Sequence, residues 1–148
     1  MFEESQIRER SRGTQGVVGI KLSEKVNIIS SIKVDSEQLI FVTENGFGKR
    51  SKSSEYRKTG RGGQGIANIE ISKKNGNVIA SFPVLEGEQL MLATDQGKII
   101  RISVDGGEGN TIRVAGRKTQ GVNLFTLSEG EKVVSVDRVK EEEDEEED

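Results

Sequence analysis

The segment from Gly60 to Gly65 combines four glycines with Arg61, and an apolar segment of alternating pattern follows it directly. Glycine lets a backbone approach a phosphate closely and present its N–H groups, and a guanidinium can donate to two phosphate oxygens at once. The segment therefore has the composition of a phosphate-binding turn. Glycine is also needed where a chain bends sharply into a strand, so a structural turn with an exposed arginine is the alternative.

Gly60, Gly62 and Gly65 also fit the spacing G-x-G-x-x-G of dinucleotide-binding loops. That motif requires a buried strand before the glycines and a helix after them, which places the pyrophosphate at the helix N-terminus. Here a polar segment precedes the turn, and the strand-like residues 66–72 follow it. This context argues against a nucleotide-binding loop.

The turn occurs three times along the chain, each time as an arginine followed by Gln-Gly at the third and fourth positions. The copies run over residues 12–22, 61–71 and 117–127, and a second pair of segments, 37–50 and 88–101, also aligns. The last glycines of the three turns are 49 and 56 residues apart. This period is that of a four-stranded propeller blade, so the sequence predicts β-propeller repeats.

Short apolar runs separated by glycine, asparagine and aspartate predict an all-β fold built from blades of four-stranded antiparallel sheet. The third copy of the repeat is partial, so we expect about two and a half to three repeats, over residues 8–56, 57–112 and 113–140, within a repeat region of residues 1–140. The expected strands are 17–22, 26–34, 38–43, 48–52, 66–72, 78–83, 89–94, 98–103, 122–127 and 132–139.

The charge is distributed unevenly. The chain carries 22 basic and 25 acidic residues, but residues 141–148 are all acidic, which leaves about +5 on the rest. We expect the acidic run to be a disordered tail. Neither histidine nor cysteine occurs, which excludes Ser-His-Asp triads, thiolate nucleophiles and zinc sites built on those ligands. Without an apolar leader or membrane span, the sequence predicts an intracellular protein that has no contact with a membrane.

Arginines that recur at equivalent places of a curved repeat protein would suit a bent polyanion. No recognition helix, zinc finger or aromatic RNA-binding motif is present, so backbone binding of duplex DNA without sequence preference is the expected activity. An acidic protein partner is the alternative, and a metal site is not expected. The candidate contact residues are Arg12, Lys49, Arg50, Arg57, Lys58, Arg61, Gly62, Gly63, Gly65, Lys98, Arg101, Arg113, Arg117 and Lys118.

The segment Thr59–Gly65 resembles the heptapeptide Q-R-R-G-G-K-G of the C-terminal domain of the DNA gyrase A subunit, with four of seven positions identical. The pattern Glu-Gln-Leu-x-x-x-Thr-x-x-Gly is similar to the repeats of that domain and of its topoisomerase IV relative. Gln64 stands where the heptapeptide has lysine, and the copies at Arg12 and Arg117 keep less of it. The chain therefore resembles the later blades of such a domain, not the first.

This resemblance implies a β-pinwheel, a propeller variant that exchanges strands between blades and wraps DNA around a basic perimeter. It implies a bacterial cytoplasmic protein associated with the nucleoid, which works with the B subunit of gyrase and with the N-terminal core of the A subunit. ATP, Mg²⁺ and the catalytic residues of the type IIA topoisomerase would then belong to other parts of the holoenzyme. The acidic tail of residues 141–148 would compete with DNA for the basic rim.

Overall fold

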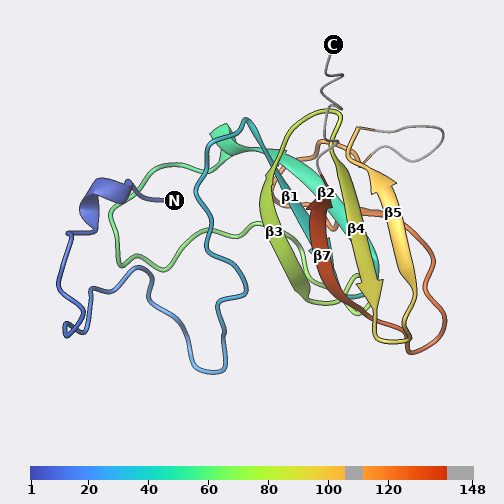
Figure 1. Cartoon of the computed structure of the whole chain (residues 1–148), viewed down its shortest axis with the longest axis horizontal. Coiled ribbons are helices and arrows are strands. Elements are labelled where there is room, and N and C mark those ends of the chain that lie inside the picture. The colour runs from blue at the N-terminus through green and yellow to red at the C-terminus, as the bar shows by residue number, and fades with distance from the viewer. Residues whose placement is uncertain (106–111, 140–148) are drawn as a thin grey trace, which may run out of the picture.

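The computed structural model describes residues 1–105 and 112–139, and strands are its main elements (Figure 1). Within these residues two 3₁₀ turns occur and no α-helix is present, so none of the described elements could span a membrane as a helix. The elements are η1 (Glu4–Gln6), β1 (Gln38–Thr43), β2 (Phe47–Lys52), η2 (Ser53–Glu55), β3 (Val78–Val84), β4 (Gln89–Thr94), β5 (Ile99–Ser103), β6 (Val122–Asn123) and β7 (Val133–Val139).

The strands form two antiparallel sheets, one of four strands in the order β3-β1-β2-β6 and one of three strands in the order β5-β4-β7. The hairpins β1-β2 and β4-β5 close at Gly46 and Gly97, whose φ angles of 81° and 80° lie in the left-handed region that glycine tolerates. The predicted all-β, propeller-type fold with antiparallel sheets is confirmed.

Each sheet draws strands from different repeats. In the four-stranded sheet, β3 follows the second turn along the chain but pairs with β1, which follows the first, with Ile40 opposite Phe82. In the three-stranded sheet, β7 follows the third turn and pairs with β4, with Leu92 opposite Val136. Neighbouring repeats are therefore held together by main-chain hydrogen bonds, whereas the repeat boundaries themselves stay a prediction.

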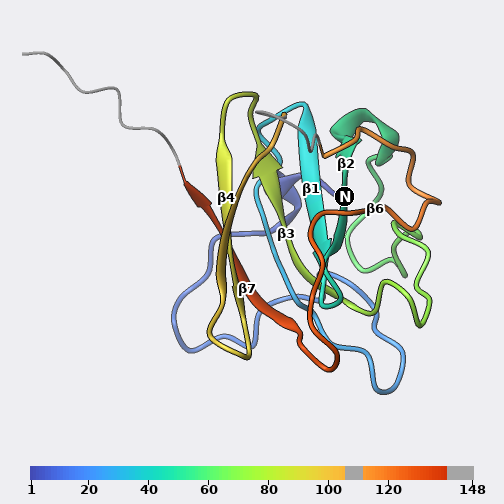
Figure 2. The same ribbon diagram turned by 90° about the vertical axis from the view of Figure 1, so that its right-hand side faces the viewer.

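The core lies between the two sheets, where β3 packs beside β7 (Figure 2). Alternate residues of the strands point into it, because successive side chains of a strand face opposite sides of the sheet. Ile40 and Val42 of β1 and Leu90 and Leu92 of β4 are fully buried there, and so is Val133, the first residue of β7.

Four of the predicted strands differ from the structure. Residues 17–22, 26–34 and 66–72 form no regular strand, and the segment predicted at 122–127 is reduced to β6. Residues 26–34 correspond by alignment to β3 and β7, each of which pairs with the hairpin of the repeat before it. The described residues hold no hairpin before 26–34, so Val26, Ile28 and Ile29 are exposed, although Ser30 Oγ donates to the carbonyl oxygen of Ser81 in β3 at 2.7 Å.

Candidate nucleic-acid interface

The three glycine-arginine turns share one backbone geometry. Gly16, Gly65 and Gly121 have φ angles of 75°, 82° and 79°, which explains the glycine after each glutamine, since L side chains rarely adopt this conformation. Gly121 has a further constraint, because a Cβ atom there would lie 2.7 Å from the carbonyl oxygen of Gly48 in β2. The third turn therefore lies directly against the first sheet.

The arginines of the second and third turns each dock on the segment that follows the preceding turn. The Arg61 guanidinium donates from NH1 to the carbonyl oxygen of Val18 at 2.6 Å. The Arg117 guanidinium donates in the same way to the carbonyl oxygen of Ala67 at 2.7 Å. Val18 lies six residues after Arg12, and Ala67 lies six residues after Arg61, so the same contact is made twice.

The main chain repeats this relationship between consecutive turns. The amide of Lys21 donates to the carbonyl oxygen of Gly63 at 2.9 Å, and the amide of Glu70 donates to that of Thr119 at 3.1 Å. Lys21 and Glu70 each lie nine residues after the arginine of their own turn. The first turn is therefore joined to the second and the second to the third.

The 3₁₀ turns hold the backbone amides of the same arginines. Gln6, at the end of η1, accepts a hydrogen bond from the Arg61 amide at 2.8 Å, and Glu55, at the end of η2, accepts one from the Arg117 amide at 3.2 Å. Arg61 is half-buried, and its Nε atom is buried without a hydrogen-bond partner. The side chains of Arg61 and Arg117 are thus engaged with the protein, while Arg12 is exposed and bonds to no other described residue.

A second arginine series lies four residues before the turn arginines, at Arg8, Arg57 and Arg113. All three side chains are exposed, and the described part of the chain gives them no hydrogen bond or ion pair. From the sequence, Arg57 and Arg113 were predicted as contact residues and Arg8 only as a basic neighbour of the turns, and the series that the three form was missed. Extending the repeat alignment by four residues toward the N-terminus would have revealed it.

Lys49 is not available to a surface ligand, although the sequence predicted it as a contact residue. Its side chain is fully buried, and Nζ donates to the carbonyl oxygens of Asn68, Gly116 and Arg117 at 2.5, 2.8 and 2.7 Å. Burial lowers the pKa of Lys49 to about 8, with Glu55 opposing this shift and Arg117 adding to it. Lys49 therefore fastens the third turn to the segment after the second.

Arg50 is the second candidate that the fold places inside. It is 6% exposed, its Nε donates to the carbonyl oxygen of Ile112 at 2.7 Å, and its NH1 donates to Gln38 Oε1 at 2.8 Å. The physical reason is the position of β2, which is covered by β1 on one side and by β6 and residues 112–115 on the other. A DNA contact by Lys49 or Arg50 conflicts with these surroundings, and we leave both out of the surface that we propose.

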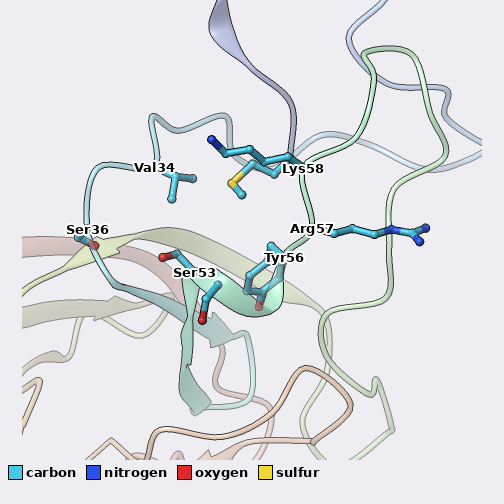
Figure 3. Close-up of a pocket in the computed structure, with 8 residues that line it drawn as sticks. Val34, Ser36, Ser53, Tyr56, Arg57 and Lys58 are labelled. Atoms are coloured by element: carbon cyan, nitrogen blue, oxygen red, sulfur yellow. The ribbon is translucent and has the colours of Figure 1, made fainter.

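The remaining charged candidates lie in two regions, one around the turns and the other in the β4-β5 hairpin. Arg57 and Lys58 line an open pocket of about 420 Å³ next to η2, and Arg57 points away from Ser36 (Figure 3). Lys58 also forms an ion pair with Glu3. Lys118 is exposed in the third turn. Lys98 and Arg101 belong to the β4-β5 hairpin, on the side of the molecule opposite the N-terminal segment (Figure 1). Their partners are Glu131, 3.0 Å from Lys98, and Gln89, which accepts from Arg101.

Among the described residues, no cluster of three or more acidic side chains could hold a metal ion. The basic side chains that face solvent around the turns are thus the chemical feature of this region. They belong to Arg8, Arg12, Arg57, Arg113 and Lys118, whereas Arg61 and Arg117 are half-buried. Such an arrangement can bind an extended anion at several points, because each charge contacts one phosphate and no base is read.

Comparison with known proteins agrees with this description. The family model for the DNA gyrase C-terminal domain, a β-propeller, matches residues 1–35, 37–84 and 88–140. The chain is 41% identical to the DNA gyrase A subunit of Staphylococcus epidermidis over 97% of its own length, and 37% identical to that of Pseudomonas aeruginosa over 95%. It spans only 16% and 15% of these two relatives.

Two solved structures have the same fold. One is of the DNA gyrase A C-terminal domain, with a TM-score of 0.73 and 28% identity, and the match covers 93% of this chain and 45% of that one. The other is of the C-terminal domain of DNA topoisomerase IV, with a TM-score of 0.82 and 25% identity, and it covers 94% of this chain and 42% of that one. Each solved chain is thus about twice as long as the part that matches.

Proposed function

This chain belongs to the DNA gyrase C-terminal domain family, and from that premise we propose that it binds duplex DNA along its series of turns, through phosphates and without reading sequence. The observation that carries the proposal is the repeated docking of one turn on the next, which sets exposed arginines at equivalent places of successive repeats. A row of cations on neighbouring repeats matches the regular phosphates of a duplex, which bends where it follows them.

In the holoenzyme we expect this binding to wrap DNA and so to support ATP-dependent negative supercoiling. The chain would act beside the B subunit of gyrase and the N-terminal core of the A subunit, on nucleoid DNA in the bacterial cytoplasm. Strand cleavage and the use of ATP and Mg²⁺ would occur in those other parts. The chain would contribute positioning of DNA and no catalytic group.

A role in topoisomerase IV is a second candidate, and the TM-score of 0.82 to its C-terminal domain favours it. The two assignments share the DNA-binding surface and differ in the reaction of the assembled enzyme. Holoenzymes that contain this chain would introduce negative supercoils into relaxed circles if it belongs to gyrase. They would relax and decatenate without introducing supercoils if it belongs to topoisomerase IV.

Fluorescence anisotropy with two duplexes of unrelated sequence tests the binding itself. We expect equal affinities for the two duplexes and a linear fall of log K with log salt, with a slope of roughly −0.9 for each phosphate neutralised. With four to six cations engaged, the slope would be about −4 to −5. A flat salt response, or binding to an acidic protein but to neither duplex, would contradict the proposal.

A further inference from the structure

We propose that the two arginine series around the turns have different tasks: Arg57 and Arg113 bind phosphates, while Arg61 and Arg117 hold consecutive turns in place and position the first pair. This inference rests on the proposed DNA binding and assigns its residues. Arg61 and Arg117, the arginines of the repeated motif, would then be positioning residues.

The positioning task follows from what Arg61 and Arg117 already bind. Each donates NH1 to a carbonyl oxygen of the preceding repeat, at 2.6 and 2.7 Å, and each has its backbone amide held by the side chain of Gln6 or Glu55. A guanidinium needs a free edge to bind a phosphate in bidentate fashion. In Arg61 the Nε edge is buried, so the bidentate approach through Nε is blocked.

The contact task follows from how Arg57 and Arg113 are presented. Ile112 is fully buried in the core, and the next residue, Arg113, is exposed to solvent. The backbone of Arg113 is fixed, because its carbonyl oxygen accepts from the Arg50 amide at 3.0 Å, and the Ala115 amide donates to the Arg50 carbonyl oxygen at 2.8 Å. Arg113 is thus an exposed guanidinium on an ordered backbone.

Arg57 is presented in the equivalent way. Tyr56 occupies the position of Ile112 in the repeat, and its ring packs 6.1 Å from that of Phe41, which is buried. The Tyr56 amide donates to the carbonyl oxygen of Ser53 at 3.1 Å, which closes η2 just before Arg57. An anchor residue, fully buried at Ile112 and half-buried at Tyr56, is therefore followed by an exposed arginine in both repeats. An ordered backbone lowers the entropy cost of holding a phosphate.

The test compares two double variants of the full chain, R57Q/R113Q and R61Q/R117Q, with K33Q/K73Q as the control that removes two exposed charges elsewhere. Duplex affinity is measured by anisotropy from about 0.05 to 0.3 M salt, and thermal stability by circular dichroism. For R57Q/R113Q we expect the wild-type melting temperature, a salt slope smaller by about 1.8 and an affinity lower on the order of 50-fold at 0.1 M salt. Restoring charge with R57K/R113K should recover most of the slope.

For R61Q/R117Q we expect a melting temperature lower by about 4 °C or more, because two bonds between repeats are lost. At a temperature where this variant is folded, its salt slope should stay within about 0.5 of wild type. The inference is overturned if R61Q/R117Q lowers the slope by about 1.8 at unchanged melting temperature, or if R57Q/R113Q binds like K33Q/K73Q. Absence of duplex binding by the wild-type chain would refute the proposed function, and the assignment of phosphate contacts with it.

Discussion

Replacing Lys49 by methionine keeps an unbranched side chain as far as the ε carbon and removes the ammonium group that joins two repeats. Three carbonyl oxygens, of Asn68, Gly116 and Arg117, would lose their donor. A buried acceptor left without a partner costs about 1 to 3 kcal/mol. Methionine also avoids the cost of burying a charge, the same cost that lowers the pKa of Lys49 to about 8.

Because these contributions oppose each other, we take the lower value of about 1 kcal/mol for each of the three carbonyl oxygens. We therefore expect K49M to reduce the free energy of unfolding by about 3 kcal/mol. For a chain of 148 residues this corresponds to a fall in melting temperature of roughly 6 to 12 °C. Urea unfolding followed by circular dichroism at pH 7 measures the change. The matched control is K52M, at an exposed position of the same strand, which should stay within about 0.5 kcal/mol of wild type.

The same variant separates a structural lysine from a DNA contact. A folded K49M chain should keep the salt slope of wild type, because Lys49 neutralises no phosphate. An unchanged urea midpoint together with a salt slope reduced by about 0.9 would show that Lys49 contacts a phosphate and does not hold the repeats together.

Five further outcomes are expected. Above about pH 8 the folded chain has released the Lys49 proton, whereas the unfolded chain, in which the pKa of this lysine is 10.5, still holds it. The free energy of unfolding should therefore rise from about pH 8 to 10.5 in wild type and not in K49M. The raised pKa of Tyr56, caused first by burial, means that the unfolded state loses this proton first, so its contribution to stability falls above pH 10. Bonds from Thr94, Ser128 and Lys98 lower the pKa of Glu131 to about 2, so its contribution is complete above pH 4.5 and is lost as pH falls toward 2, and acid titration of E131Q should lack this component. Gly121→Ala should cost about 1 to 3 kcal/mol in urea unfolding, whereas Gly13→Ala, with open space around it, should cost far less. Removing the acidic residues 141–148, which lie outside the described residues, should tighten duplex binding at low salt, and equal affinity would contradict competition by this segment.

Local signals in the sequence were sufficient to predict the β1-β2 and β4-β5 hairpins. Gly46 and Gly97 supply the positive φ angles that tight turns need, and the continuous apolar runs within residues 38–43 and 89–94 predict the first strand of each hairpin. The segments 17–22 and 26–34 have similar apolar content and still form no strand. An apolar segment is able to pair as a strand, but whether a partner strand is present depends on residues far along the chain.

The candidate site was predictable as a region but not residue by residue. The repeated Arg and Gln-Gly identified the turns, because glycine in the left-handed region has few substitutes. The acceptor of Arg61 lies 43 residues earlier, at Val18, and no local pattern could reveal that bond. Lys49 misled the prediction for a related reason, since a lysine in a polar strand is normally exposed, and only the covering of β2 on both sides buries it.

The most direct test of the central claim is a topology assay on relaxed circular DNA. The chain is bound to the circle, a type I topoisomerase relaxes the unbound part, and the linking number is read after the protein is removed. A DNA-wrapping surface on the series of turns predicts a shift in linking number that grows with protein and that R57Q/R113Q diminishes. The sense of the shift expected for a gyrase-type wrap is positive. An unchanged linking number at concentrations that saturate the circle would contradict wrapping by this chain.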